Sequence, residues 1–374
     1  MRLPALVQPI LLASVFCSAT YAERPYRVFE KTNTVVLDVG GRGKFDSTQA
    51  KYPSILRVGE SWWMWYNGRT DDRFTGSIGL ATSKDGVRWE KQNNGTPVFK
   101  HGKPGTFDST KVDHPTVLRF GGKFHMWYTA GDAASRYTIG YATSDDGKQW
   151  ERQNGGRPVL GAGKKGQFDD QVVLHPAVVR DQRGLLHLWY NGVGPQKSFR
   201  VGHATSRDGI HWTRSNQGQP VLNPSRVGSF DEGYVYNVFV MIEGDKFHMW
   251  YSAWAKNDRT TGPNHNGIVH AVSQDGDHWV KDPVPTLTNG PRAASTNTRV
   301  LPATWFAAIV VGGCIIRLLL ARGAGSTACH WRRAAAENEP PLMCTTEKPW
   351  ALADWSGCPG RRTLRGNGTS RPAK

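Results

Sequence analysis

The sequence has no cysteine between Glu23 and Gly290, although the chain of 374 residues contains five cysteines in all. This region therefore has no disulfide bond, no thiol nucleophile and no cysteine-based metal site. The cysteines lie outside it, and the last four are too widely spaced to form the compact ligand pairs of a zinc site: Cys17, Cys314, Cys329, Cys344, Cys358. We predict no metal and no cofactor.

Helical periodicity is also missing from this region, and a tandem repeat stands in its place. The pattern Ser-x-Asp-Gly-x-x-Trp occurs four times, beginning at Ser83, Ser144, Ser206 and Ser273. Two further markers recur about every 60 residues: Phe-Asp at Asp46, Asp108, Asp169 and Asp231, and Trp-Tyr at Trp65, Trp127, Trp189 and Trp250. Repeats of this length, rich in aromatic and turn residues, are typical of β-propeller blades. The fold class is therefore all-β.

The second repeat shows the expected blade most clearly. Pro115 to Phe120 predicts an inner strand, and a Gly-Gly turn leads into a second strand, Lys123 to Tyr128. A third strand is expected at residues 138–143 and a short outer strand at 150–152, joined by the Asp-Gly turn. Propeller ligands bind where the inner strands converge, so the residues just before these strands are the candidates for function.

The N-terminal segment bears on the number of blades. Arg27 to Lys31 and the residues that follow match the fourth strand and connecting loop of a repeat. A strand that precedes the first blade belongs to the last one, where it closes the ring. Four clear repeats of about 62 residues plus this strand predict five blades, the last being degenerate or missing. A closed four-bladed ring is the alternative.

Three regions follow from these patterns. Residues 1–22 combine an early arginine, an apolar run and small residues, which predicts a signal peptide and hence a secreted or periplasmic protein. Residues 23–290 form the propeller domain. Residues 291–374 do not continue the repeat, and we expect a disordered basic tail. Arg317 interrupts its apolar run, so we predict no firm membrane anchor.

The formal net charge of +16 is unevenly distributed. Residues 291–374 hold 12 Lys and Arg against 4 Asp and Glu, which leaves the repeat region only mildly basic. Its positive residues are scattered among turns and strand edges instead of forming a stripe. Nucleic acid is therefore not the predicted partner.

The repeat region resembles the five-bladed propeller glycosidases, such as the arabinanases, levansucrases and invertases of families 43, 32, 62 and 68. The resemblance rests on proline at the start of inner strands, on Met-Trp-Tyr in second strands, on Ile-Gly-Tyr-Ala-Thr-Ser in third strands and on the Asp-Gly-x-x-Trp turn. It covers Arg27 to about Pro285 and implies acid–base hydrolysis of a carbohydrate. Those enzymes place a base Asp, a modulating Asp and an acid Glu near the starts of three inner strands, and only Asp113 matches here.

A comparison among the repeats separates framework from candidate site. Every blade needs the same turns, whereas a substrate needs different groups at different positions. The four Phe-Asp aspartates are therefore expected to be structural, as turn or cap residues. The tryptophans of the Trp-Tyr pairs recur in every blade as well, and we expect them to pack between blades. The candidates are residues that differ between blades, together with one top-loop arginine: Tyr52, Arg73, Asp113, His114, His175, Glu232, Tyr236 and Asn237.

These candidates receive separate roles. Asp113 is the favoured general base or pKa modulator, and Glu232 the favoured general acid, because glycoside hydrolysis uses two carboxyl groups. The others are expected to bind substrate, with Tyr52, Tyr236 or the non-periodic Trp254 stacking on sugar. The favoured function is an exported glycoside hydrolase acting on a polysaccharide or oligosaccharide. A non-catalytic propeller that binds carbohydrate or protein is the alternative. The sugar, the linkage and the oligomeric state stay open.

Overall fold

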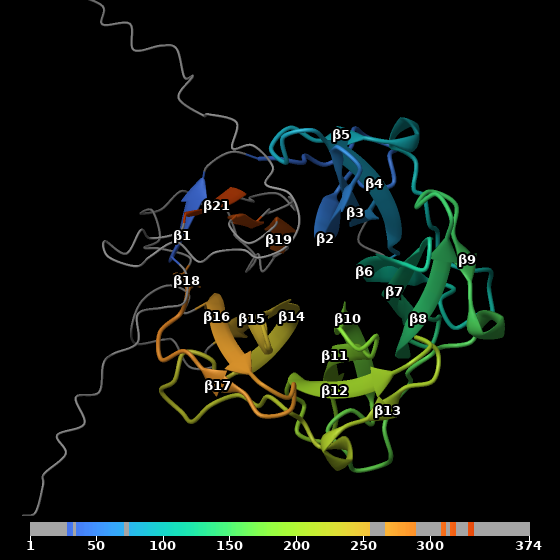
Figure 1. The fold of residues 1–374 in the computed structure, drawn as a ribbon. Helices are drawn as coiled ribbons and strands as arrows, with labels where there is room; N and C mark the ends of the chain where they lie inside the picture. Colours follow the sequence, from blue (N-terminus) through green and yellow to red (C-terminus); the bar gives the residue numbers. More distant parts are fainter. Residues whose placement is uncertain are drawn as a thin grey trace, which may run out of the picture. The chain divides into compact units, whose positions relative to one another are not determined.

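The four repeats form four antiparallel blades arranged around a common axis in the computed structural model (Figure 1). The structure describes residues 28–32, 35–70, 75–254, 266–288, 308–311, 315–318 and 328–332. Each blade runs from an inner strand near the axis to a two-residue outer strand. The predicted all-β propeller is confirmed, but the structure shows four blades where five were predicted.

The blade strands follow one another along the chain. The first two blades are β2 (Gln49–Val58), β3 (Ser61–Arg69), β4 (Ser77–Ser83) and β5 (Glu90–Lys91), then β6 (Lys111–Phe120), β7 (Lys123–Gly131), β8 (Tyr137–Ser144) and β9 (Glu151–Arg152). The next two are β10 (Val172–Arg180), β11 (Leu186–Val193), β12 (Arg200–Ser206) and β13 (Thr213–Arg214), then β14 (Tyr234–Glu243), β15 (Lys246–Trp254), β16 (Asn266–Ser273) and β17 (Val280–Lys281). The short β18 (Leu287–Thr288) also pairs with β16.

The inner strands begin earlier than the sequence predicts. In the second blade β6 starts at Lys111, four residues before Pro115, where the sequence pattern places the strand start. Single-turn 3-10 helices follow three of the outer strands: η1 (Asn93–Gly95), η2 (Asn154–Gly156) and η3 (Asn216–Gly218). Within the described ranges no helix is long and apolar enough to cross a membrane.

A further four-stranded sheet joins the beginning of the chain to its later part. Its strand order is β1-β21-β20-β19, and β1 pairs antiparallel with β21. The strands are β1 (Val28–Thr32), β19 (Ala308–Val311), β20 (Ile315–Leu318) and β21 (Ala328–Arg332). The N-terminal segment thus pairs as an edge strand, whereas residues 35–37 form no strand. The disorder expected for residues 291–374 stays a prediction, and residues 1–22 lie outside the described ranges.

The Trp-Tyr tryptophans pack between blades, as their recurrence predicts. Trp65, Trp127 and Trp189 are fully buried. Each indole Nε1 donates a hydrogen bond to the glycine carbonyl of the next blade's Asp-Gly turn, at Gly147, Gly209 and Gly276, over 2.8 to 2.9 Å. A buried indole usually finds such a partner, and here the bond links neighbouring blades.

The Phe-Asp aspartates are buried links within each blade. Asp169 is 0% exposed, accepts a hydrogen bond from the Tyr190 hydroxyl at 2.9 Å and pairs with Arg214 at 2.9 Å. The other blades repeat this arrangement with Asp46, Asp108 and Asp231, each bound to a second-strand tyrosine and an outer-strand Lys or Arg. The structural role expected for the four aspartates is therefore confirmed, although the carboxylates bind side chains instead of capping backbone amides.

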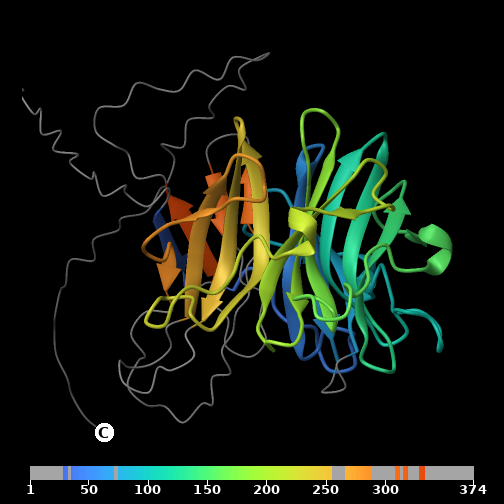
Figure 2. The same cartoon turned by 90° about the horizontal axis from the view of Figure 1, so that it is seen from below.

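The course of each blade places two sets of residues at opposite ends of the axis. Because β2, β3 and β4 are antiparallel, the start of β2 and the Asp-Gly turn after β4 lie at opposite ends of the blade. The strands stand side by side in the second view (Figure 2). The end at which the inner strands start is called the entry end below, and the other is called the turn end.

Candidate functional site

The inner strand of every blade is interrupted at one equivalent point by a β-bulge. The strand register shifts between Lys51 and Ser54 in the first blade and at the matching positions of the other three. In each bulge one residue adopts the left-handed backbone: Tyr52 (φ 52°), His114 (46°), His175 (56°) and Asn237 (51°). That conformation costs about 1 to 2 kcal/mol for residues with a side chain, and such strain gathers at functional sites. These four residues are called the funnel ring.

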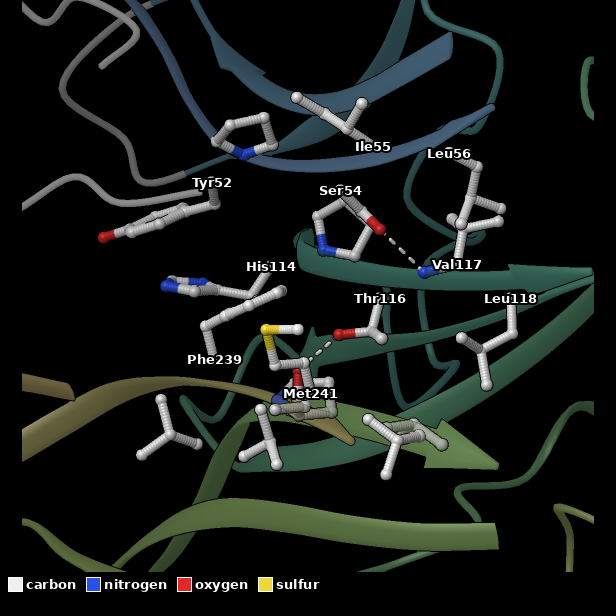
Figure 3. A pocket seen from close by; sticks show the side chains of 18 of the residues that line it. Tyr52, Ser54, Ile55, Leu56, His114, Thr116, Val117, Leu118, Phe239 and Met241 are labelled. Atoms are coloured by element: carbon white, nitrogen blue, oxygen red, sulfur yellow. Dashed lines mark hydrogen bonds between the residues drawn. The ribbon is translucent and has the colours of Figure 1, made fainter. Parts of the chain in front are cut away.

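The funnel ring side chains contact one another on the axis. The Tyr52 and His114 rings are stacked with centroids 3.2 Å apart, and the His114 and His175 rings with centroids 3.7 Å apart. Figure 3 shows the first pair face to face. His114 Nε2 lies 3.2 Å from Asn237 Oδ1, which joins the fourth blade to the stack. The structure therefore brings together four of the predicted site residues.

Polar residues just after the Trp-Tyr pairs hold the funnel ring in place. Asn191 Oδ1 accepts a hydrogen bond from the Asn237 amide at 2.9 Å and lies 3.2 Å from His175 Nδ1. Thr129 Oγ1 accepts the His175 amide at 2.8 Å. These bonds satisfy the backbone groups that the bulges remove from the strand ladder. The bonds to the His175 and Asn237 amides also tie one blade to the next.

Asp113 lies behind the funnel ring. It is 2% exposed, and its carboxylate pairs with the Arg69 guanidinium at 2.8 Å. Asp113 Oδ1 accepts the His114 amide at 2.9 Å and is 3.3 Å from His114 Nδ1. Burial alone would raise the pKa of Asp113. The neighbouring His114, Arg69 and Lys111 nevertheless hold this pKa well below its usual range. Asp113 thus remains ionised and reaches the axis through His114.

Cationic side chains surround this carboxylate. Burial, with the nearby Arg69 charge, lowers the pKa of Lys51 to about 7, and burial also lowers the pKa of Lys111. Burial lowers the pKa of His114 to about 4 and that of His175 well below its usual range. Both imidazoles are therefore neutral at pH 7, so each offers one hydrogen-bond donor and one acceptor.

The remaining predicted residues are not members of the funnel ring or lie outside the described ranges. Glu232 precedes β14, and its Oε2 accepts the Gly228 amide at 2.6 Å. The Tyr236 ring lies 6.0 Å from the Phe199 ring, which is itself 6.3 Å from the His175 ring. Arg73 lies outside the described residues, and nothing is described of the Trp254 side chain.

A cavity of about 630 Å³ follows the axis from the funnel ring to the turn end. Its described lining comes from the four inner strands β2, β6, β10 and β14. In the part of the chain that the structure describes, none of the lining residues is acidic, and Asp113 and Glu232 are not among them. A volume of this size is in the range of small-ligand sites.

The described ranges contain no candidate metal site. No group of three or more His, Cys, Asp or Glu side chains there could hold a metal ion. His114 and His175 are stacked face to face, and hydrogen bonds link each to an amide side chain. The described funnel ring therefore presents imidazole and amide groups to a ligand.

Comparisons with known proteins give relatives of unknown function. No protein-family model matches the chain. Two uncharacterized proteins of Mycobacterium tuberculosis are each 29% identical to it over 186 residues. The match covers 47% of this chain and 58% of each relative, so the chain spans little more than half the length of these proteins.

Solved structures share the fold. A glycosyl hydrolase from Bacteroides ovatus has a TM-score of 0.64 at 17% identity, covering 82% of this chain and 94% of its own. A structure from work on the GH130 family of mannoside phosphorylases and β-1,2 mannosidic linkages has 0.65 at 15%, covering 83% and 95%. Another glycoside hydrolase has 0.61 at 19%, covering 84% and 96%. At these identities the likeness shows the fold, that of glycoside hydrolase-like propellers.

Sequence reasoning missed the residues that support the funnel ring. Lys51 and Lys111 break the repeat at inner-strand positions, and the residue after each Trp-Tyr pair varies as Asn67, Thr129, Asn191 and Ser252. The comparison among repeats that selects the funnel ring selects these too, once it is extended beyond the axis and the top loops. Variation between blades is thus the signal that finds both sets.

Proposed function

We propose that this protein is a glycoside hydrolase-like propeller that binds a polysaccharide or oligosaccharide at the funnel ring and hydrolyses it. One observation carries the proposal: four positions share the same strained backbone yet carry three kinds of side chain. A framework needs identical groups in each blade, whereas an asymmetric ligand needs different ones. The likeness to glycoside hydrolase propellers supports a carbohydrate as that ligand.

Asp113 and His114 supply the first part of the chemistry. The ionised Asp113 orients His114 from behind, and the neutral His114 ring contacts the ligand. Hydrolysis requires a group that accepts a proton from water at the sugar. In this proposal His114 meets the water, and Asp113 acts as the modulator of its pKa or takes the proton itself after the side chains rearrange.

Glu232 is the proposed second carboxylate, the general acid that gives its proton to the leaving oxygen of the glycosidic bond. Its side chain precedes β14, the strand that carries Asn237, so a rearrangement of this loop would bring it toward the axis. In the described state it caps the Gly228 amide, as Asp170 caps the Gly166 amide in the preceding blade. Asp170 therefore provides a matched control for the loop contact.

A non-catalytic carbohydrate-binding propeller is the second candidate. It is favoured by the absence of an acidic residue from the described lining of the axial cavity. Stacked rings and amides suffice to bind a sugar, whereas hydrolysis needs two carboxyl groups within about 5 to 9.5 Å of each other. The two candidates differ in turnover and agree on where the sugar binds.

Binding and turnover are tested in sequence. An array of plant and microbial glycans identifies a bound oligosaccharide, and release of reducing sugar from it measures hydrolysis. We expect Asp113→Asn and Glu232→Gln each to lower turnover by about 10² to 10⁴ while the affinity is largely kept. Asp170→Asn, which alters only the equivalent loop contact, should leave turnover unchanged.

The possible outcomes separate the candidates. Binding without turnover by the parent protein supports the non-catalytic propeller. Turnover that survives both Asp113→Asn and Glu232→Gln rejects the two carboxylates. The absence of any bound glycan rejects the carbohydrate function.

We further propose that the protein is exported and that the sheet β1-β21-β20-β19 is a fifth blade. The apolar leader within residues 1–22 supports export. For the fifth blade, β19 lies against the inner strand β2, and β1 is the edge strand, where the other blades have their outer strand. Slow hydrogen exchange at the amides of Val28–Thr32 is expected, and exchange at the rate of an unfolded peptide would reject this blade.

A further inference from the structure

The turn end of the axial cavity carries a second set of equivalent residues. Arg57, Arg119 and Arg180 line the cavity, each five positions after a funnel ring residue, and the fourth blade has Ile242 there. Five residues of strand span about 16 Å. The three arginines, called the arginine rim, therefore lie at the opposite end of the cavity from the proposed sugar site.

Aromatic rings hold the guanidinium groups of the arginine rim. Arg57 lies over the Trp62 ring at 5.0 Å, Arg119 over Phe124 at 5.1 Å and Arg180 over Phe120 at 5.1 Å. Stacking of this kind leaves the N–H groups at the edge of each guanidinium available to an anion. The rim is therefore organised before any ligand arrives.

Carboxylates do not neutralise most of the rim. In the described residues Arg57 pairs with Glu60 at 3.6 Å, with side chains 46% and 84% exposed, and Arg119 and Arg180 form no ion pair. The nearby Asp181 carboxylate instead accepts backbone amides of its own loop, from Arg183 and Leu185. The cavity mouth thus has a positive charge that is available to a ligand.

The cavity wall between its two ends is apolar. It includes Ile55, Leu118, Val179 and Met241. Its hydroxyl groups are already used: Thr116 donates to the Pro176 carbonyl at 2.6 Å, and Ser54 accepts the Val117 amide at 2.9 Å (Figure 3). This wall favours an apolar ligand over a sugar, because it offers few groups that could replace the hydrogen bonds a sugar makes to water.

We propose that the turn end of the cavity binds a single-chain amphiphile with an anionic head. The apolar chain lies along the axis, and the carboxylate or phosphate head lies between Arg119 and Arg180. The positive arginines bind the anionic head, and the apolar wall buries the chain. This site is separate from the funnel ring and does not depend on the proposed hydrolysis.

Titration calorimetry on the full chain tests the site with sodium dodecanoate and dodecyl phosphate below their micelle concentrations. Saturable binding is expected for one or both, and their relative affinities distinguish a carboxylate from a phosphate head. Acetate and dodecanol, which carry only the head or only the chain, should bind at least about tenfold more weakly. Shortening the carboxylate should weaken binding by about fourfold per methylene.

The double variant Arg119→Gln/Arg180→Gln should bind dodecanoate about tenfold or more weakly than the parent. Arg207→Gln is the control, because Arg207 is an exposed residue of an Asp-Gly turn at the same end. Acetate binding as tightly as dodecanoate would show a plain anion site. Dodecanol binding equally well would exclude a role for the arginines. Either result, or no binding of any amphiphile, overturns the proposal.

Discussion

The Phe-Asp aspartates occupy one equivalent position in each blade, and the funnel ring residues occupy another. The two sets repeat in different ways. The aspartates keep one side chain and one set of partners in all four blades. The funnel ring keeps one backbone conformation and changes its side chain from Tyr to His to Asn. In this propeller, periodic side chains build the framework, and a periodic backbone with varied side chains builds the site.

The difference has a physical basis. A buried carboxylate is stable only with its partners, so every blade that keeps the aspartate must keep a tyrosine hydroxyl and a Lys or Arg as well. A bulge places its side chain on the axis whatever that side chain is, because the turn of the backbone sets the direction. The axis can therefore acquire new chemistry while the blade stays intact.

The largest effect on stability is expected from replacing a framework aspartate. Asp169→Ala leaves the Arg214 guanidinium and the Tyr190 hydroxyl without their buried acceptor. Loss of one partner from a buried ion pair costs about 3 to 5 kcal/mol in the free energy of unfolding. Urea unfolding of the purified variant measures this loss.

A surface aspartate provides the control for this experiment. Asp145 pairs with Lys123 at 3.1 Å, but its side chain is 81% exposed. Asp145→Ala should change the free energy of unfolding by less than about 1 kcal/mol. A small loss in both variants would show that the periodic aspartates are not the framework.

The sequence predicted the framework much better than the site. The four repeats were enough to predict the blades, the tryptophans between blades and the structural aspartates. A residue that recurs in every repeat meets a structural need that every blade has. The same comparison located Tyr52, His114, His175 and Asn237 on the axis. It could not show that Asp113 is buried behind His114 or that Glu232 caps a loop amide, since both depend on contacts between segments whose placement only the folded chain defines.

The smallest effect on stability, with a clear effect on binding, is expected from Asn237→Gly. Glycine adopts φ near 51° without strain, and the backbone amide that donates to Asn191 is kept. The free energy of unfolding should change by less than about 1 kcal/mol. Carbohydrate affinity should fall about two- to tenfold, because the Asn237 side-chain amide that contacts His114 at the axis is lost.

Asn154→Gly is the matched control for this last change. Asn154 also has a left-handed backbone, with φ of 57°, but it lies in η2 on an outer loop, where its side chain donates to the Pro158 carbonyl at 2.9 Å. Unfolding and glycan titration of both variants should therefore give similar stabilities and different affinities. A large loss of stability in Asn237→Gly with unchanged affinity would place Asn237 in the framework and remove the distinction between the two kinds of position.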